Sequence, residues 1–134
     1  MTDLGFLADD GLVDALLMEV AGLLHRLIEN DEAGSIDLRA MPLSPSCIEM
    51  LKQRLGPGEI TVMLNAAGRS EIHETGFSGV WWTNHANEAG RVIAMLIEVA
   101  TVPEILRANI DDMRGSLVRL PASTNIARNR RAHG

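Results

Sequence analysis

The hydrophobic pattern of this chain changes its period at Gly56–Glu59, and this change constrains the fold more than any other feature. Before it, large apolar residues recur every three or four positions, as on the buried face of an amphipathic helix. After it, Ile60, Val62 and Leu64 alternate with other residues, which is the period of a strand with one buried face. Helices followed by strands predict an α+β fold.

The longest apolar stripe predicts a helix over Leu12–Ile28. The stripe holds nine large apolar residues, a face broader than the seam of a coiled coil. Asp9 or Asp10 would cap this helix and favour its dipole. We interpret the segment as a helix that lies across a sheet, and the alternative is a helix shared with a second subunit.

A second, shorter helix is predicted from Ser46 to Leu55. Ser46 and Glu49 have the spacing of a capping box, in which each side chain bonds to the backbone amide of the other residue. Ile48 and Leu51 share an inward face with Leu55, and the glycine that follows suits the end of a helix.

Four strands and a closing helix are predicted downstream. The strands lie at Glu59–Asn65, Arg69–Thr75, Val80–His85 and Arg91–Ala100, with turn residues between them. The last strand is a nearly continuous apolar run, which implies burial on both faces. The closing helix is predicted at Glu104–Met113, after Pro103. The short segment Ile36–Leu38 is either an edge strand or a linker.

The predicted fold class is therefore α+β, with two N-terminal helices, a four-stranded antiparallel meander and a closing C-terminal helix. A chain of 134 residues is expected to form one domain, which we place at residues 1–120. Residues 121–134 carry three arginines and no acidic residue, and we predict that they form a basic, disordered tail.

Composition argues against several classes of protein. Residues 1–120 contain 18 acidic and 9 basic residues, one of them lysine, which is unlike a nucleic-acid-binding surface. No apolar run approaches about 20 residues, so no membrane insertion is expected. The start lacks a cationic region and a cleavage site, so no secretory signal is expected. With one cysteine, Cys47, and hence no internal disulfide, these features predict a cytoplasmic protein.

Three of the four aromatic residues, Phe77, Trp81 and Trp82, lie within six positions of one another. Gly76 and Gly79 suit a tight turn between the strands on either side. Adjacent residues of a strand point to opposite faces, so Trp81 and Trp82 cannot both enter one core. Either both faces of the sheet are covered or one indole faces outward.

Residues that could bind a metal are scattered along the chain. They are Cys47, Glu71, His73, Glu74 and His85. Structural zinc sites use Cys and His residues in regular pairs, and the sequence has no such pairs. We predict that the chain carries no stoichiometric metal and no cofactor, and the alternative is a loose metal site formed by His73 and His85 across a hairpin.

Three other roles follow from the predicted positions of single residues. Cys47 lies in the first turn of a predicted helix, where the helix dipole could lower the pKa of its thiol and make it reactive. The alternative, which we favour, is that Cys47 is a small apolar residue without a chemical role. Glu74 either acts as a general base or accepts hydrogen bonds from turn amides near Thr75–Gly79, which we favour. Glu98, in an apolar strand, is expected to pair with an arginine.

Three blocks of sequence resemble a known family. They read Gly56-x-Gly58-Glu59-Ile60, Glu74-Thr75-x-x-x-Gly79-Val80-Trp81 and Ile97-Glu98-Val99-Ala100-x-Val102-Pro103. Across about Leu51–Leu106 the chain is similar to the conserved C-terminal region of hydrogenase expression/formation proteins of the HupH/HyaF type. The resemblance implies an accessory protein for maturation of uptake [NiFe] hydrogenases, associated with the iron–sulfur small subunit.

The function that we favour is that of a non-catalytic assembly chaperone for the hydrogenase small subunit or other maturation proteins. The predicted partner-binding residues are Glu74, Thr75, Phe77, Gly79, Val80, Trp81 and Trp82, and the predicted structural residues are Gly58, Glu59, Glu98 and Pro103. The alternative is a small metal-carrying protein or enzyme that uses His73, Glu74 and His85. The resemblance implies that longer members carry a related region twice, and the strand Arg91–Ala100 is apolar on both faces. We therefore predict that the chain forms a homodimer or presents a large apolar patch beside Trp81 and Trp82.

Overall fold

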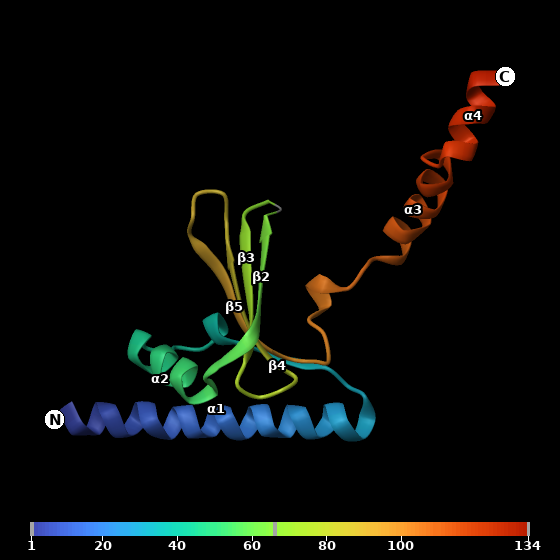
Figure 1. Cartoon of the computed structure of the whole chain (residues 1–134). Helices are drawn as coiled ribbons and strands as arrows, with labels where there is room; N and C mark the ends of the chain where they lie inside the picture. The colour runs from blue at the N-terminus through green and yellow to red at the C-terminus, as the bar shows by residue number, and fades with distance from the viewer. Residues whose placement is uncertain (1, 66, 134) are drawn as a thin grey trace. The chain divides into compact units, whose positions relative to one another are not determined.

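The computed structural model describes residues 2–65 and 67–133 of the chain (Figure 1). The chain forms two compact units that divide after Pro103. The first unit contains α1 (Thr2–Asn30), β1 (Gly34–Asp37), the 3-10 helix η1 (Leu38–Ala40), α2 (Pro45–Leu55), β2 (Pro57–Asn65), β3 (Arg69–Thr75), β4 (Val80–Ala86) and β5 (Val92–Val99). The second unit contains the 3-10 helix η2 (Glu104–Leu106), α3 (Ile110–Ala122) and α4 (Asn125–His133).

The first unit is built on an antiparallel sheet with the strand order β1-β5-β4-β3-β2. The four predicted strands form the expected meander, which confirms the α+β class. The predicted number of strands is wrong, because β1 adds a fifth strand beside β5 and pairs Ile36 with Ile97. The side chain of Ile36 is buried in the core, which favours an edge strand over a linker at this position.

Helix α1 starts at Thr2, so neither Asp9 nor Asp10 is its cap. Both aspartates contact α2 or its cap instead. The Ser44 hydroxyl donates to Asp9 Oδ2 at 3.1 Å, and Arg54 Nη2 lies 3.4 Å from Asp10 Oδ1. These acidic residues therefore hold α2 beside α1.

Helix α2 is capped by Ser44, and the capping box predicted at Ser46 is wrong. The Ser44 hydroxyl accepts a hydrogen bond from the Cys47 amide at 3.0 Å, and Pro45 occupies the start of the helix. Proline is favoured at the first helical position because its φ suits the helix and it has no N–H that needs a partner. The cap must therefore precede Pro45.

Helix α1 runs across one end of the strands and α2 lies beside the sheet (Figure 1), and both share a core with side chains of one sheet face. The buried side chains that join them to this face are Val13, Leu16, Val20, Cys47, Leu51, Leu55, Val80, Trp82, Ile97 and Val99. Trp81 points to the opposite face, where its indole N–H donates to the Ala100 carbonyl at 3.0 Å. Trp81 and Trp82 are 6% and 3% exposed, so both faces of the sheet are covered at β4 and neither indole faces outward.

The second unit differs from the closing helix predicted at Glu104–Met113. The 3-10 helix η2 follows Pro103, and α3 begins only at Ile110. The Asn109 side chain explains this start, because its oxygen accepts from the backbone amide of Asp111 at 2.7 Å and so caps the helix.

The chain divides after Pro103, whereas the sequence led us to place a single domain at residues 1–120. Residues 125–133 form α4, within the segment predicted as a disordered tail. That this segment is disordered in solution stays a prediction. In the described part of the chain, no helix is both long and apolar enough to cross a membrane.

Gly58 provides a test of the close approach of β2 to β3. A Cβ at this position would lie 2.5 Å from the Thr75 carbonyl oxygen, so we expect Gly58→Ala to destabilise the chain by about 1–3 kcal/mol through overpacking. Urea unfolding measures the effect. The control is Gly22→Ala in α1, where nothing lies within 4 Å and a small gain is expected. Equal stabilities of the two variants would contradict the close approach of β2 to β3.

Candidate functional site

The turn between β3 and β4 is held by Thr75. Its hydroxyl donates to the Val80 carbonyl at 2.8 Å and accepts from the Phe77 amide at 3.2 Å. Gly79 has φ of 86°, a conformation that glycine adopts without strain. Thr75 therefore fills the bracing role that the sequence led us to expect of the Glu74 carboxylate.

The predicted aromatic contact surface is mostly buried. Of the predicted partner-binding residues, Thr75, Val80, Trp81 and Trp82 are buried, and Glu74 and Gly79 are half-buried. Phe77 is 53% exposed at the tip of the turn. The indole N–H of Trp82 donates to Asn84 Oδ1 at 3.3 Å. A partner can therefore reach Phe77 directly, but reaches the tryptophans only through the cavity described next.

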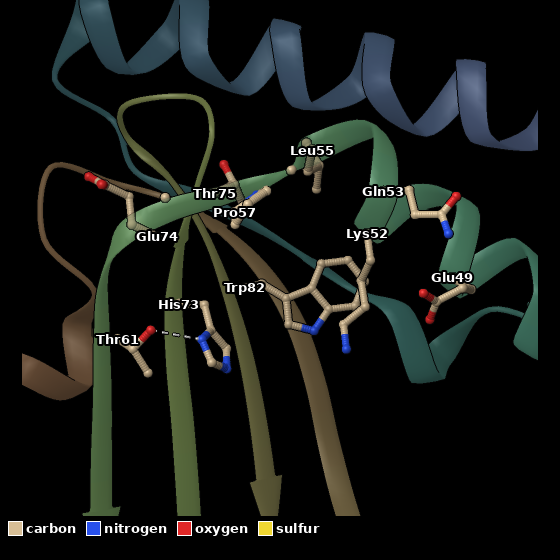
Figure 2. Close-up of a pocket in the computed structure, with 12 residues that line it drawn as sticks. Glu49, Lys52, Gln53, Leu55, Pro57, Thr61, His73, Glu74, Thr75 and Trp82 are labelled. Carbon is tan, nitrogen blue, oxygen red and sulfur yellow. Dashed lines mark hydrogen bonds between the residues drawn. The ribbon is translucent and has the colours of Figure 1, made fainter.

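A cavity of about 540 Å³ lies where the C-terminal part of α2 meets β2, β3 and β4 (Figure 2). It is lined by Glu49, Lys52, Gln53, Leu55, Gly56, Pro57, Gly58, Thr61, His73, Glu74, Thr75 and Trp82. The pairing of β2 with β3 is irregular between Pro57 and Thr61, next to this cavity. We call it the Lys52–Trp82 pocket, after two lining side chains that lie against each other (Figure 2).

Lys52 places a positive charge over the indole of Trp82. Its Nζ atom lies 5.4 Å from the ring centroid, within range of a cation–π interaction. No ion pair of Lys52 is present among the described residues, whereas Arg54 on the same helix lies 2.9 Å from Asp14 Oδ1. The ammonium group is therefore available to an anionic ligand.

His73 forms the floor of the pocket beside Trp82 (Figure 2). Its Nδ1 lies 3.2 Å from the Thr61 hydroxyl, and its Nε2 lies 3.7 Å from Glu71 Oε2. Glu74 also lines the pocket, but its carboxylate points away from His73 and Trp82 (Figure 2). The side chains at the base of the pocket are thus Thr61, His73 and Trp82.

The loose metal site considered for His73 and His85 does not form. His73 pairs with Trp82 across β3 and β4, and His85 pairs with Ser70, three positions away along β3. An odd separation places the two imidazoles on opposite faces of the sheet. In residues 2–65 and 67–133, no three His, Cys, Asp or Glu side chains gather in a way that could hold a metal ion.

Cys47 is fully buried in the first turn of α2. Burial, followed by the negative charge of Asp9, raises the pKa of its thiol. The burial of the side chain favours the interpretation of Cys47 as a small apolar core residue.

The predicted structural residues lie in different environments. Gly58 has no room for a side chain, Pro103 is fully buried and Glu98 is half-buried on β5. Glu59 is exposed on β2. An arginine partner for Glu98 stays a prediction.

The sequence alone did not identify the residues that α2 contributes to the pocket. Sequence reasoning placed Glu49 in a capping box and gave Lys52 and Gln53 no role, since nothing local ties these residues to a strand many positions away. One signal was present, because Lys52 is the only lysine in the chain.

A comparison with known protein families identifies the family of this chain. The family model described as "HupH hydrogenase expression protein, C-terminal conserved region" matches residues 13–126, which include the larger part of α1, all of α2 and the whole sheet. The chain belongs to the HupH hydrogenase expression protein family. This confirms the resemblance found in the three sequence blocks.

Individual HupH-family relatives agree with this membership. The chain is 30% identical over 115 residues to hydrogenase expression/formation protein HoxQ of Azotobacter vinelandii, covering 83% of this chain and 41% of the relative. It is 28% identical over 111 residues to hydrogenase-1 operon protein HyaF of Escherichia coli K12, covering 83% of this chain and 39% of the relative. The chain thus spans about two fifths of the length of these curated relatives.

A solved structure is similar in both fold and length. The hydrogenase expression protein HupH from Thiobacillus denitrificans superimposes with a TM-score of 0.77 at 44% identity, covering 85% of this chain and 98% of the solved one.

Thr75 and Glu74 make distinguishable predictions for the turn. We expect Thr75→Val to lower the free energy of unfolding by about 1–3 kcal/mol, because it leaves buried hydrogen-bonding groups without a partner. Thr75→Ser keeps the hydroxyl and should lose less, and Glu74→Gln should change stability by only about 0.5 kcal/mol. Chemical denaturation compares the three. A larger loss of unfolding free energy for Glu74→Gln than for Thr75→Val would show that Glu74, and not Thr75, stabilises the turn.

The burial of Cys47 predicts a slow thiol. In the folded chain its raised pKa keeps the thiol protonated to higher pH than in the unfolded chain, and its burial excludes reagents. Alkylation by iodoacetamide at pH 8 should be about 100-fold slower or more than in urea-unfolded chain, corresponding to about 3 kcal/mol of opening free energy. Equal rates would show that the first turn of α2 is open.

Proposed function

We propose that this chain is a non-catalytic accessory protein that acts in the cytoplasm during maturation of an uptake [NiFe] hydrogenase, holding the iron–sulfur small subunit. The observation that carries the proposal is the HupH-family match across residues 13–126. The relatives are named as hydrogenase expression/formation proteins, which supports an accessory role.

The Lys52–Trp82 pocket supports a binding role. Its apolar wall is the Trp82 indole with Leu55 and Pro57, and its polar groups include the Lys52 ammonium and the His73 imidazole. Pockets with apolar walls and a few convergent polar groups are the usual form of a binding site. The partner surface is therefore proposed to run from Phe77 at the turn to this pocket, in place of exposed tryptophans.

The separation of His73 from His85 weighs against the metal-carrier or enzyme alternative. Each imidazole has a neighbouring hydroxyl, Thr61 for His73 and Ser70 for His85, on its own face of the sheet. His73 and His85 lie on opposite faces of the sheet, so they do not form one metal site or active site together.

We also propose that the chain forms a homodimer, through α3 and not through the indole faces. Large apolar side chains are exposed along this helix, and Ile110, Met113, Leu117 and Leu120 recur at the spacing of one helical face, 46–72% exposed. A soluble chain rarely leaves such a stripe uncovered, and pairing two copies is the simplest cover.

Light scattering tests the dimer. The wild-type chain should have twice the monomer mass, 14.5 kDa, and Leu117→Asp should shift it to the monomer at micromolar concentration. Gly115→Asp adds the same charge on the other side of α3 and should leave the dimer intact. A wild-type monomer at all concentrations would overturn the proposal.

The functional proposal is tested in cells that produce an uptake [NiFe] hydrogenase and lack their own HupH-family protein. An affinity-tagged copy of this chain should restore hydrogenase activity and co-purify with the small subunit before the enzyme is complete. Restored activity with no association with the small subunit would contradict the holding role. Full activity without any family member would contradict the maturation role in that system.

A further inference from the structure

We infer that the free edge of β2, together with the Lys52–Trp82 pocket, binds an extended peptide segment of the partner that carries an acidic side chain. This inference rests on the proposed function and names the part of the partner that the site recognises. Three observations carry it: an unprotected strand edge, a pocket that continues a row of side chains across the sheet, and an available lysine.

Strand β2 offers a backbone that can accept another strand. It lies at the edge of the sheet and, in the part of the chain that the structure describes, pairs with β3 alone. It spans nine residues, whereas β1 at the opposite edge spans four. Its regularly paired part, Thr61–Asn65, contains neither proline nor charge, the residues that usually protect an exposed edge.

The pocket lies in line with this edge. Thr61 on β2 pairs with His73 on β3, and His73 pairs with Trp82 on β4, so these three side chains form one row on the same face. A strand added to β2 would extend the row by one position, about 4.8 Å beyond Thr61. In strand addition, main-chain hydrogen bonds supply affinity and the side chains that alternate into a pocket supply specificity.

Lys52 is the group at the pocket with which an acidic side chain would pair, and the lining also includes the carboxylates of Glu49 and Glu74. Residues 1–103 contain 15 acidic residues and only 6 basic ones, yet Lys52 forms no ion pair within the described residues and rests on Trp82. The added strand would lie three strand spacings, roughly 14 Å, from β4, so a Glu side chain lying over Thr61 and His73 would meet Lys52 when its ammonium moves off the Trp82 ring toward His73. Its carboxylate would replace the ring as the partner of the ammonium, in a charge-assisted bond.

The test uses the full chain and synthetic nine-residue peptides that alternate valine and threonine, with glutamate at the centre and both ends blocked. Binding is measured by fluorescence anisotropy of a labelled peptide. We expect the glutamate peptide to bind and its glutamine counterpart to bind about tenfold more weakly. N-methylation of alternate amides on one edge of the glutamate peptide should abolish binding, because it removes the strand hydrogen bonds.

Protein variants assign the contact. With Lys52→Met the two peptides should bind equally, whereas Arg91→Met, which removes a charge from the turn before β5, should leave the tenfold preference unchanged. Lys52→Glu should prefer a peptide with central lysine. Equal binding of the glutamate and glutamine peptides by the wild-type chain would overturn the inference. So would binding that survives N-methylation on each of the two edges tested separately.

Failure of this inference can be told from failure of the proposed function. If Lys52→Met still co-purifies with the small subunit as well as the wild-type chain does, the pocket inference is overturned and the maturation role stands. If the wild-type chain itself does not associate with the small subunit in cells, the holding role fails whatever the peptides do.

Discussion

Trp81 and Trp82 are neighbours on β4, so their indoles lie on opposite faces of the sheet and each needs its own cover. The arrangement of the first unit follows from this requirement. Helices α1 and α2 cover the Trp82 face, and Ala100, where the chain leaves β5, accepts the indole N–H of Trp81 on the other. Truncating either buried indole would lower the free energy of unfolding by several kcal/mol. The packing of the helices and of the meander therefore depends on this one strand.

The same constraint produces the pocket. Helix α2 must reach Trp82 to cover it, and it does so at its C-terminal half, where Lys52 lies over the ring. Strand β2 leaves α2 through Gly56 and Pro57 and becomes regularly paired only at Thr61. The space between the helix end and the strand is the Lys52–Trp82 pocket. The burial of Trp82 and the pocket are thus two results of one packing arrangement.

The order of elements could be predicted from the sequence because hydrophobic period is a local property. Strand β3 was predicted with its observed bounds, and β2, β4 and β5 within two residues. The errors came from choices between neighbouring signals. Ser44 and Ser46 both resemble caps, and Pro45 decides between them. Ile36 was ambiguous because a four-residue edge strand depends on pairing with β5, far along the sequence.

The site was harder to predict than the fold, because it depends on which residues meet in space. The sequence drew attention to Trp81 and Trp82 as partner-binding residues, but both indoles are buried, because removing such large apolar side chains from water is favourable. Glu74 and Thr75 are adjacent, and only the register of the turn shows that the hydroxyl reaches Val80. Lys52 joins Trp82 across thirty positions of sequence, a contact that no local pattern reveals.

The central claim is that the partner docks along β2 beside the pocket. Site-specific photo-crosslinking in hydrogenase-producing cells tests it most directly, with the crosslinking residue at Thr61 on β2 or, as a control, at Met18, which is 72% exposed on α1. The account predicts a crosslink to the hydrogenase small subunit from Thr61 and none from Met18. A crosslink from Met18 with none from Thr61 would contradict it and move the partner surface to the helical face.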